Sequence, residues 1–341
     1  MIGIDDVLRR TWSRDCASWD KLQLPELDKV ISMHVHLSGG GVGNVLFAIR
    51  YIFMYGLALN RRVELSFDPR VDIHSIITPG QYDWRSQAAG AVPLPKHYLM
   101  YCSNLTDGSA FKIMEPNIRI RTVDGSNGWR CNFGSVFRKL RNAGLLPQKQ
   151  YARISNIAHS SSCFFQYFFR FNQTFYQHLP PGYLEAPHKL GLHLRWGDAQ
   201  YIGRQPSYQQ FKREVRISKE FMGQCVIFQP HCINKVGAGK YLFVATDNPV
   251  GTKKVLKHIL KTVESNANNF SVDEGHWHTG KLNNNVTVIQ SAYKHAFRDF
   301  LGLMLAEKVF SPTHSTFSLL AAEAGLKRTQ RSCPAFCKAL V

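Results

Sequence analysis

Short apolar segments alternate with helical stretches through the second half of the chain, from about residue 186 onward. Short apolar strands separated by amphipathic helices are typical of βαβ units on a parallel sheet. The pattern therefore predicts a Rossmann-like C-terminal domain. Its expected strands are 190–195, 241–246, 286–290 and 309–311, and its expected helices lie near 208–221, 252–263, 295–307 and 316–325.

The N-terminal half begins with the same alternation: a strand at 32–37, a turn at 39–44, a helix at 45–60 and a strand at 62–67. Residues 71–150 are rich in Gly, Pro, Asn and Ser and support no assignment. A Pro-Pro-Gly cluster at 180–182 breaks regular structure, so we expect domains at 1–182 and 183–341. Two Rossmann-like α/β domains that face each other across a cleft would suit a transferase with two substrates.

The composition agrees with a globular protein of two domains. A chain of 341 residues, 44% hydrophobic and 19% charged, is too long for one ordinary core. The formal net charge of +18 indicates an anionic substrate drawn by a positive field, with solubility or a non-specific affinity for nucleic acid as the alternative. The sequence shows no zinc-ligand spacing, RNP motif or basic–aromatic repeat, which disfavours a dedicated nucleic-acid module.

No segment resembles a signal peptide or a membrane anchor. Residues 1–19 carry several charges, and the apolar run at 45–59 contains Arg50 and is too short to span a bilayer. The aromatic stretch at 164–171 is interrupted by Gln166 and Arg170, so we expect a core helix there. We expect a cytoplasmic protein, with a Golgi or other secretory lumen as the alternative if the chain is a truncated ectodomain.

The eight cysteines form no Cys-x-x-Cys pair, so a structural zinc site is not expected. We expect free buried thiols, with a bridge between Cys333 and Cys337 as the alternative. Four Asn-x-Ser/Thr sequons occur, only slightly more than chance would give in this composition. They begin at Asn104, Asn172, Asn269 and Asn285.

Basic residues mark the end of the expected strand at 190–195. Because side chains alternate along a strand, His193 and Arg195 share one face and Leu190, Leu192 and Leu194 share the other. The carboxyl edge of a parallel sheet is where such sheets bind ligands. A guanidinium fork there matches phosphate oxygens, so the sequence predicts an anionic, phosphorylated ligand.

A glycine-rich segment at 39–44 follows the first expected strand. Glycines permit a tight turn and close approach of a ligand to a helix N-terminus, although a plain turn is the alternative. The segment is not a dinucleotide fingerprint, because Asn44 and Leu46 occupy the positions where a third glycine is needed. Asp68, beside Pro69, is interpreted as a turn residue rather than as a ribose-binding acid.

Four segments, in order along the chain, resemble motifs of the α1,2-, α1,6- and protein O-fucosyltransferases. They are Gly-x-Gly-Asn-x-x-Phe at 41–47, His-x-Arg-x-Gly-Asp at 193–198, Ala-Thr-Asp-Asn-Pro at 245–249, and the closing pattern from Asp-Phe-Leu to Ser-Thr-Phe-Ser at 299–318. The first two look closest to the α1,2 type. The resemblance implies the GT-B architecture and GDP-fucose as donor, generally without a metal or other cofactor.

The resemblance also implies roles for individual residues. Arg195 would hold the diphosphate, His193 would help to position the diphosphate or the ribose, and Asp247 would pair with the guanine edge. Without a metal, arginine and backbone N–H groups must stabilise the departing diphosphate. The other nucleotide-sugar-binding candidates are Gly43 and Asn44, facing the cleft, and Ser315, Thr316 and Phe317, meeting the β-phosphate.

The catalytic base is open. Asp198, in the loop after the strand, is the first candidate, and His36, before the glycine segment, is the alternative. Asp299 and Glu323 are further acids, for which helix capping or an ion pair is an equal alternative. Catalysis without a side-chain base also remains possible within this superfamily.

The sequence departs from the resemblance where the common Arg-Arg pair reads Arg195-Trp196. One guanidinium is missing beside the phosphates, and Trp196 cannot replace its charge. We expect an inverting fucosyltransferase that uses a GDP-sugar donor and a glycan acceptor, with α1,2 linkage preferred. The alternatives are another nucleotide sugar, protein O-fucosylation, a non-catalytic nucleotide- or glycan-binding protein, and a nucleic-acid binder.

Overall fold

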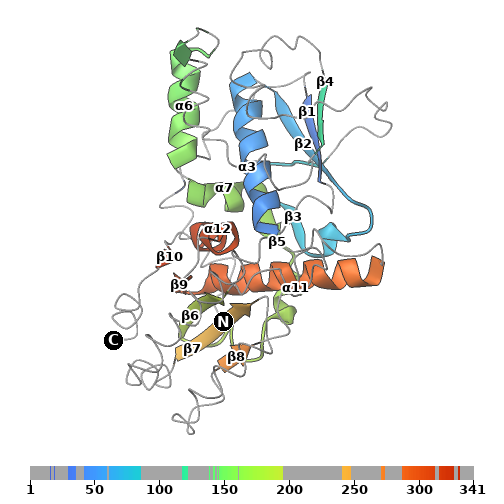
Figure 1. Ribbon diagram of the computed structural model, residues 1–341, viewed down its shortest axis with the longest axis vertical. Coiled ribbons are helices and arrows are strands. Elements are labelled where there is room, and N and C mark those ends of the chain that lie inside the picture. Colours follow the sequence, from blue (N-terminus) through green and yellow to red (C-terminus); the bar gives the residue numbers. More distant parts are fainter. Residues whose placement is uncertain are drawn as a thin grey trace, which may run out of the picture. The chain divides into compact units, whose positions relative to one another are not determined.

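The chain forms two compact units, Met1–Arg170 and Phe171–Val341, which divide ahead of the Pro-Pro-Gly cluster at 180–182. Figure 1 shows the computed structural model. It describes residues 16, 19, 30–35, 42–59, 61–85, 117–121, 138, 141–142, 144, 146–159, 161–194, 240–246, 270–272, 286–311, 315–325 and 329–330.

The described part of the N-terminal unit holds a three-stranded parallel sheet in the order β2-β1-β4. β1 (Val30–Val35) and β2 (Arg62–Phe67) confirm the two predicted strands, and β4 (Asn117–Arg121) lies in the stretch that could not be assigned. The helix α3 (Val42–Leu59) connects β1 to β2 and packs on both (Figure 1). This is the strand–helix–strand unit that the sequence predicts.

The start of α3 corrects one expectation. The segment at 39–44 was predicted as a turn, but the helix begins at Val42, so its second and third residues are Gly43 and Asn44. The reason is the spacing of apolar side chains, which is already helical at this point. The buried side chains Val42, Val45, Leu46 and Ile49 recur at the i, i+3, i+4, i+7 interval of one helix face.

Further short elements are described up to the boundary between the two units. They are η1 (Ile73–Ser75), β3 (Ile77–Pro79), α6 (Gln148–His159), α7 (Ser161–Phe168) and β5 (Phe169–Phe171), which pairs with β3. The predicted core helix at 164–171 is confirmed up to residue 168, and the last three residues are a strand. None of the described helices is long and apolar enough to cross a membrane.

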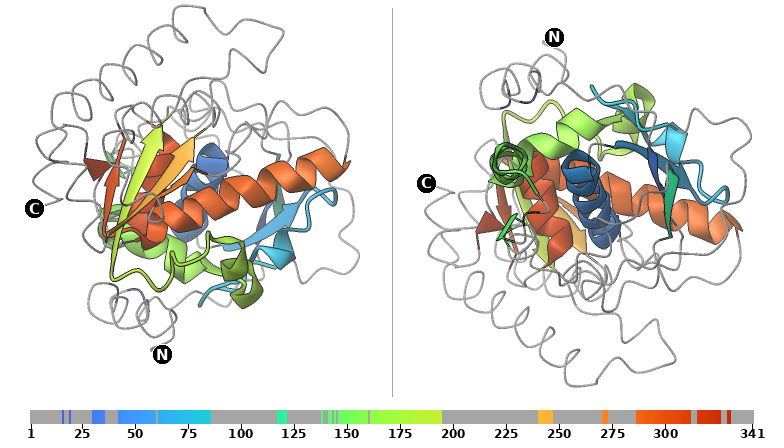
Figure 2. Two further views of the ribbon diagram at one scale, coloured as in Figure 1. Left: turned by 90° about the horizontal axis from the view of Figure 1, so that it is seen from below. Right: turned by 90° about the horizontal axis from the view of Figure 1, so that it is seen from above.

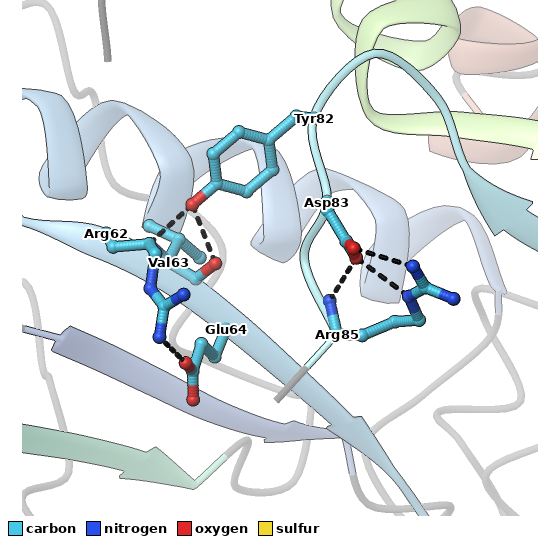
Figure 3. Close-up of polar contacts among 6 residues, drawn as sticks. All are labelled: Arg62, Val63, Glu64, Tyr82, Asp83 and Arg85. Atoms are coloured by element: carbon cyan, nitrogen blue, oxygen red, sulfur yellow. Dashed lines mark hydrogen bonds and ion pairs between the residues drawn. The ribbon is translucent and has the colours of Figure 1, made fainter. Parts of the chain in front are cut away.

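Within the described residues, β2 is an edge strand, and the segment 82–85 covers its open side (Figure 3). The Tyr82 hydroxyl accepts from the N–H of Val63 at 2.7 Å and donates to the carbonyl of Val63 at 2.8 Å. The N–H of Leu65 donates to the carbonyl of Trp84 at 2.8 Å. These bonds satisfy backbone groups that an exposed edge would present to another chain. Figure 3 also shows the ion pairs Arg62–Glu64 and Asp83–Arg85.

A disulfide joins Cys16 to Cys163 in α7, across a sequence separation of 147 residues. The expectation of free thiols is therefore wrong for these two cysteines; the other six lie outside the described residues. Both cysteines are buried, and nearby Trp19 stacks on Phe53 of α3 with ring centroids 6.3 Å apart. The bridge and this ring pair tie the segment near residue 16 to two helices of the unit.

The described part of the C-terminal unit holds a five-stranded parallel sheet in the order β10-β9-β6-β7-β8. β6 (His188–Leu194), β7 (Lys240–Thr246) and β9 (Lys308–Phe310) confirm three of the four predicted strands. Two very short edge strands, β8 (Phe270–Val272) and β10 (Thr329–Gln330), were not predicted. The 3-10 helix η4 (Gln173–His178) precedes the sheet.

The fourth predicted strand, at 286–290, is wrong: these residues are the first part of the helix α11 (Val286–Leu305). Their β-branched side chains favour a strand locally, but the buried positions that follow have helical spacing. Figure 2 shows α11 along one face of the sheet of β6 and β7. α12 (Thr316–Ala324), predicted from the sequence, packs against α11 and ends at Gly325.

Two glycines allow α11 to lie close to the sheet. A Cβ on Gly302 of α11 would lie 2.4 Å from ring carbons of Phe243 in β7, and a Cβ on Gly191 of β6 would lie 2.9 Å from Leu303. The Tyr183 hydroxyl donates to the carbonyl of Gly302 at 2.6 Å, which adds a hydrogen bond to this close contact. Burial raises the pKa of Tyr183, so this donor stays protonated at physiological pH.

Candidate functional site

Three strands of the C-terminal sheet bring their carboxyl ends to one edge. In the parallel register Leu194 of β6 pairs with Thr246 of β7, and Leu192 of β6 pairs with Phe310 of β9. Thr246 and Phe310 are buried. Arg195 follows Leu194 directly in the sequence, and Asp247 follows Thr246. The carboxyl edge of such a sheet is the expected ligand position in this class of fold.

His193 lies inside the protein, just before the end of β6. It is 1% exposed, and its ring centroid is 5.4 Å from that of Phe317 in the first turn of α12. It shares a strand face with Gly191, the residue that packs against α11. The Phe317 ring in turn meets Phe300 of α11 edge-on at 5.7 Å. His193 is therefore a packed residue that holds the end of β6 against α12, whose Phe317 in turn contacts α11.

The N-terminus of α12 lies at this edge, because its first turn contacts the end of β6 through Phe317 and His193. Ser315, the N-cap residue, is buried and has extended backbone angles. Its carbonyl accepts from the N–H of Leu319 at 3.1 Å and from the Ser318 hydroxyl at 3.2 Å. Among the described atoms the Ser315 hydroxyl makes no capping bond. The first N–H groups of a helix and its dipole together favour a bound anion.

Ser311 is a residue of this edge that the sequence analysis did not single out. It comes directly after β9, four positions before Ser315, and is 1% exposed. The signal was present in the sequence: a hydroxyl residue that follows a short apolar strand, just before the segment leading to α12.

The acids of the two C-terminal helices lie in different environments. Asp299 is buried in α11, where its Oδ1 lies 3.2 Å from an Nη2 of its neighbour Arg298, which is itself buried. This pairing supports the ion-pair interpretation of Asp299 over a role as catalytic base. Glu323 lies half-buried near the end of α12, at the opposite end of that helix from Ser315.

In the N-terminal unit the structure places two of the predicted site residues. Gly43 is buried in the first turn of α3, and Asn44 follows it in the same turn. This turn comes after the carboxyl end of β1 along the chain. The interpretation of Asp68 as a turn residue is confirmed. Its carboxylate accepts from the backbone N–H of Arg70 at 3.0 Å and from the guanidinium of Arg70 at 2.9 and 2.6 Å.

Four predicted site residues lie outside the described residues: His36, Arg195, Asp198 and Asp247. Their roles stay predictions from the sequence. In the part of the chain that the structure describes, no group of three or more His, Cys, Asp or Glu side chains could hold a metal ion. Metal independence likewise stays a prediction.

Comparison with known proteins gives a likeness of fold. No protein-family model and no curated protein matches the chain. Among solved structures, a mutant of Arabidopsis thaliana FUT1 in complex with GDP superposes with a TM-score of 0.51 at 14% identity, over 95% of this chain and 76% of that one. POFUT1 in complex with GDP (TM-score 0.45, 12% identity, 89% and 98% coverage) and the α-1,6-fucosyltransferase NodZ with GDP (0.43, 12%, 87% and 92%) are more distant. With its parallel sheets and flanking helices, the chain has the mixed α/β, Rossmann-like fold of the GT-B glycosyltransferases.

Proposed function

We propose that this protein is an inverting glycosyltransferase that transfers fucose from GDP-fucose to a hydroxyl of a glycan, with α1,2 linkage as the preferred product. One observation carries the proposal: the first turn of α12 lies against the end of β6, whose last residue pairs with the last residue of β7. This edge combines a helix N-terminus with the two strand ends that lead into Arg195 and Asp247. The fold of FUT1, a protein crystallised with GDP, agrees with this reading.

The proposed chemistry needs stabilisation of negative charge. The acceptor oxygen attacks C1 of fucose, the bond from C1 to the β-phosphate oxygen breaks, and its electron pair leaves with GDP. Arg195 and the first N–H groups of α12 would neutralise that charge. Asp247, directly after β7, would read the guanine edge. The acceptor proton would pass to Asp198, to His36, or to solvent if no side chain serves as base.

The first experiment is calorimetric titration of the purified protein with GDP, UDP, ADP and CMP, in EDTA and then with Mg²⁺ or Mn²⁺. The proposal expects GDP-selective binding that needs no metal. Binding of UDP that requires a metal would indicate a transferase for another nucleotide sugar. If none of the four nucleotides binds, the donor site proposed here is wrong.

Arg195→Ala tests the proposed charge stabilisation. Removing one donor of this kind should lower kcat by about 10²- to 10³-fold, and Arg195→Lys should restore only part of it because a lysine cannot bind in a fork. Arg170→Ala is the matched control, since Arg170 is exposed on β5. Loss of activity in both variants to the same extent would remove Arg195 from the mechanism.

A non-catalytic nucleotide- or glycan-binding protein is the second candidate, and the Trp196 position favours it. The missing guanidinium would weaken transition-state stabilisation more than ground-state binding. The discriminating measurement is release of GDP from GDP-fucose with a β-galactoside acceptor, followed by NMR assignment of any product linkage. If GDP binds but no turnover occurs in the wild type or in Trp196→Arg, the binding protein is favoured.

A further inference from the structure

The buried disulfide between Cys16 and Cys163 bears on the compartment in which the chain matures. Cytosolic glutathione and thioredoxin keep thiols reduced, so structural disulfides belong to oxidising compartments such as the secretory lumen. Here the bridge joins two segments 147 residues apart in the sequence, inside a core where both cysteines are at most 1% exposed. The bridge disfavours the cytoplasm, which was expected from the sequence.

A sequon lies on the surface of the same molecule. Asn172, Gln173 and Thr174 form the turn that begins η4; Asn172 is half-buried, and the other two residues are exposed. The Asn172 side-chain oxygen accepts from the N–H of Thr174 at 3.2 Å and from the Thr174 hydroxyl at 3.0 Å. The asparagine and the hydroxyl that the modification requires are thus held together by the fold.

Phe175, the residue that follows this sequon, packs the turn onto the apolar core. Phe175 is 1% exposed, and its ring stacks on Phe171 at a centroid distance of 5.7 Å. The backbone of Asn172 is extended, with φ −61° and ψ 137°. A glycan at this position would therefore project from a fixed surface turn without displacing the apolar core beneath it. The asparagines of the other three sequons lie outside the described residues.

We infer that the chain matures in an oxidising secretory lumen and that Asn172 carries an N-linked glycan. The inference does not depend on the proposed transferase activity. In the lumen two thiols lose two electrons and two protons to the disulfide of an oxidoreductase, which becomes a dithiol. At Asn172 the side-chain nitrogen bonds to the first sugar of a polyprenyl-pyrophosphate-linked oligosaccharide. The sugar–phosphate bond breaks, the polyprenyl pyrophosphate leaves, and the nitrogen loses one proton.

The test uses the protein isolated from the cells that make it, with free thiols alkylated during lysis. Digestion without reduction should yield a cross-linked peptide pair that contains Cys16 and Cys163. Peptide-N-glycosidase treatment in heavy-oxygen water should leave a labelled aspartate at position 172. An unmodified Asn172 would overturn the inference, and alkylated Cys16 and Cys163 would overturn its compartment argument.

Variants expressed in the same cells separate the glycan from the fold. Asn172→Asp keeps an oxygen that can cap η4 but removes the nitrogen that carries the glycan, so one glycan should be lost. Thr174→Ala should also lose it, whereas Thr174→Ser keeps the hydroxyl and should retain it. The readout is the change in electrophoretic mobility on deglycosylation. The same change in Asn172→Asp as in the wild type would place the glycan elsewhere and contradict the assignment.

Discussion

In the described part of the N-terminal unit a disulfide joins segments that are far apart in the sequence, whereas in the C-terminal unit a helix packs closely on a sheet and is held by the hydroxyl of Tyr183. The Cys16–Cys163 bridge and the Tyr82 hydroxyl, which bonds to the backbone of Val63, serve the first unit. In the C-terminal unit, Gly191 and Gly302 have no side chain to separate α11 from the sheet, so the helix packs closely on it. Loss of the disulfide should therefore be specific to the first unit, and an added Cβ at Gly302 should disturb the contact between helix and sheet in the second.

The difference matters for function because the proposed donor site, at the carboxyl edge of the sheet beside β6 and β7, belongs to the C-terminal unit. Its geometry depends on the depth at which α11 and α12 pack, which positions Phe317 against His193. A small shift of these helices would move the N-terminus of α12 away from the strand ends. Catalysis is sensitive to a misplacement of about 1 Å in the reacting groups. Additions to the C-terminal packing should thus impair nucleotide binding, while deletions in the N-terminal links should mainly affect stability.

The largest expected effect is the loss of the disulfide. Cys16→Ala combined with Cys163→Ala should lower the free energy of unfolding by roughly 3–5 kcal/mol, because a long loop gains entropy in the unfolded chain. Hydrogen exchange followed by mass spectrometry should show faster exchange in α3 and α7. Peptides of α11 in the same molecule are the internal control. Equal acceleration in α11 would contradict the separation of the two units' stabilising contacts.

Gly302→Ala tests the contact between helix and sheet in the C-terminal unit. In a helix interior this change ordinarily stabilises, but here the new Cβ would lie 2.4 Å from the Phe243 ring. We expect destabilisation by roughly 2–3 kcal/mol, measured by denaturant unfolding, together with weaker GDP binding. Adding Phe243→Leu should recover part of the loss because it removes the ring. A stabilised Gly302→Ala variant would show that the contact between helix and sheet can relax.

Tyr82→Phe removes one hydroxyl that serves two backbone groups. The N–H and the carbonyl of Val63 would both lose their partner, at a cost of roughly 1–2 kcal/mol. Tyr183→Phe, in the C-terminal unit, is the matched control. Among the described residues its hydroxyl bonds only to the carbonyl of Gly302, so about 1 kcal/mol is expected there. Amide exchange at Val63 should accelerate in Tyr82→Phe alone. If both variants lose the same free energy of unfolding, the second hydrogen bond of Tyr82 contributes nothing to stability.

The sequence predicted the elements whose pattern is local. The apolar runs of β1, β2, β6, β7 and β9 and the helical stretches between them indicate the parallel sheets, and the apolar stretch of α12 was predicted as a helix. The strand predicted at 286–290 was wrong because β-branched residues favour a strand locally and the packing of a long helix overrides that preference. The edge strands β8 and β10 were missed because Phe-Ser-Val and Thr-Gln contain no continuous apolar run, whereas β9 has Val309 and Phe310 side by side.

Less of the candidate site than of the fold could be predicted from the sequence. Strand ends could be located, since the register of a parallel sheet brings them to one edge. The burial of His193 against Phe317 could not be predicted, because it depends on how α12 packs against the sheet. The pairing of Cys16 with Cys163 was equally hidden, since nothing in the spacing of eight cysteines identifies two partners 147 residues apart.

The smallest expected effect concerns charge in the C-terminal unit. Desolvation lowers the pKa of His178 in η4, and the positive charges of Lys294, Arg298 and His295 on α11 lower it further. The lowered pKa makes protonation costlier in the folded state than in the unfolded chain. His178 therefore contributes stability that is present above its unfolded pKa of about 6.5 and is lost as the pH falls through that value toward the folded pKa.

His178→Gln should make the free energy of unfolding less dependent on pH between about pH 7.5 and about pH 5.5. The difference from the wild type should stay below about 1 kcal/mol because His178 is exposed at the surface. Denaturant unfolding across this range measures it. High salt should shrink the part that arises from the exposed charge of Lys294, and should leave the parts that arise from desolvation and from the buried Arg298. If salt changes nothing, the shift arises from desolvation of the ring, whose centroid lies 5.2 Å from that of Phe175, and from Arg298.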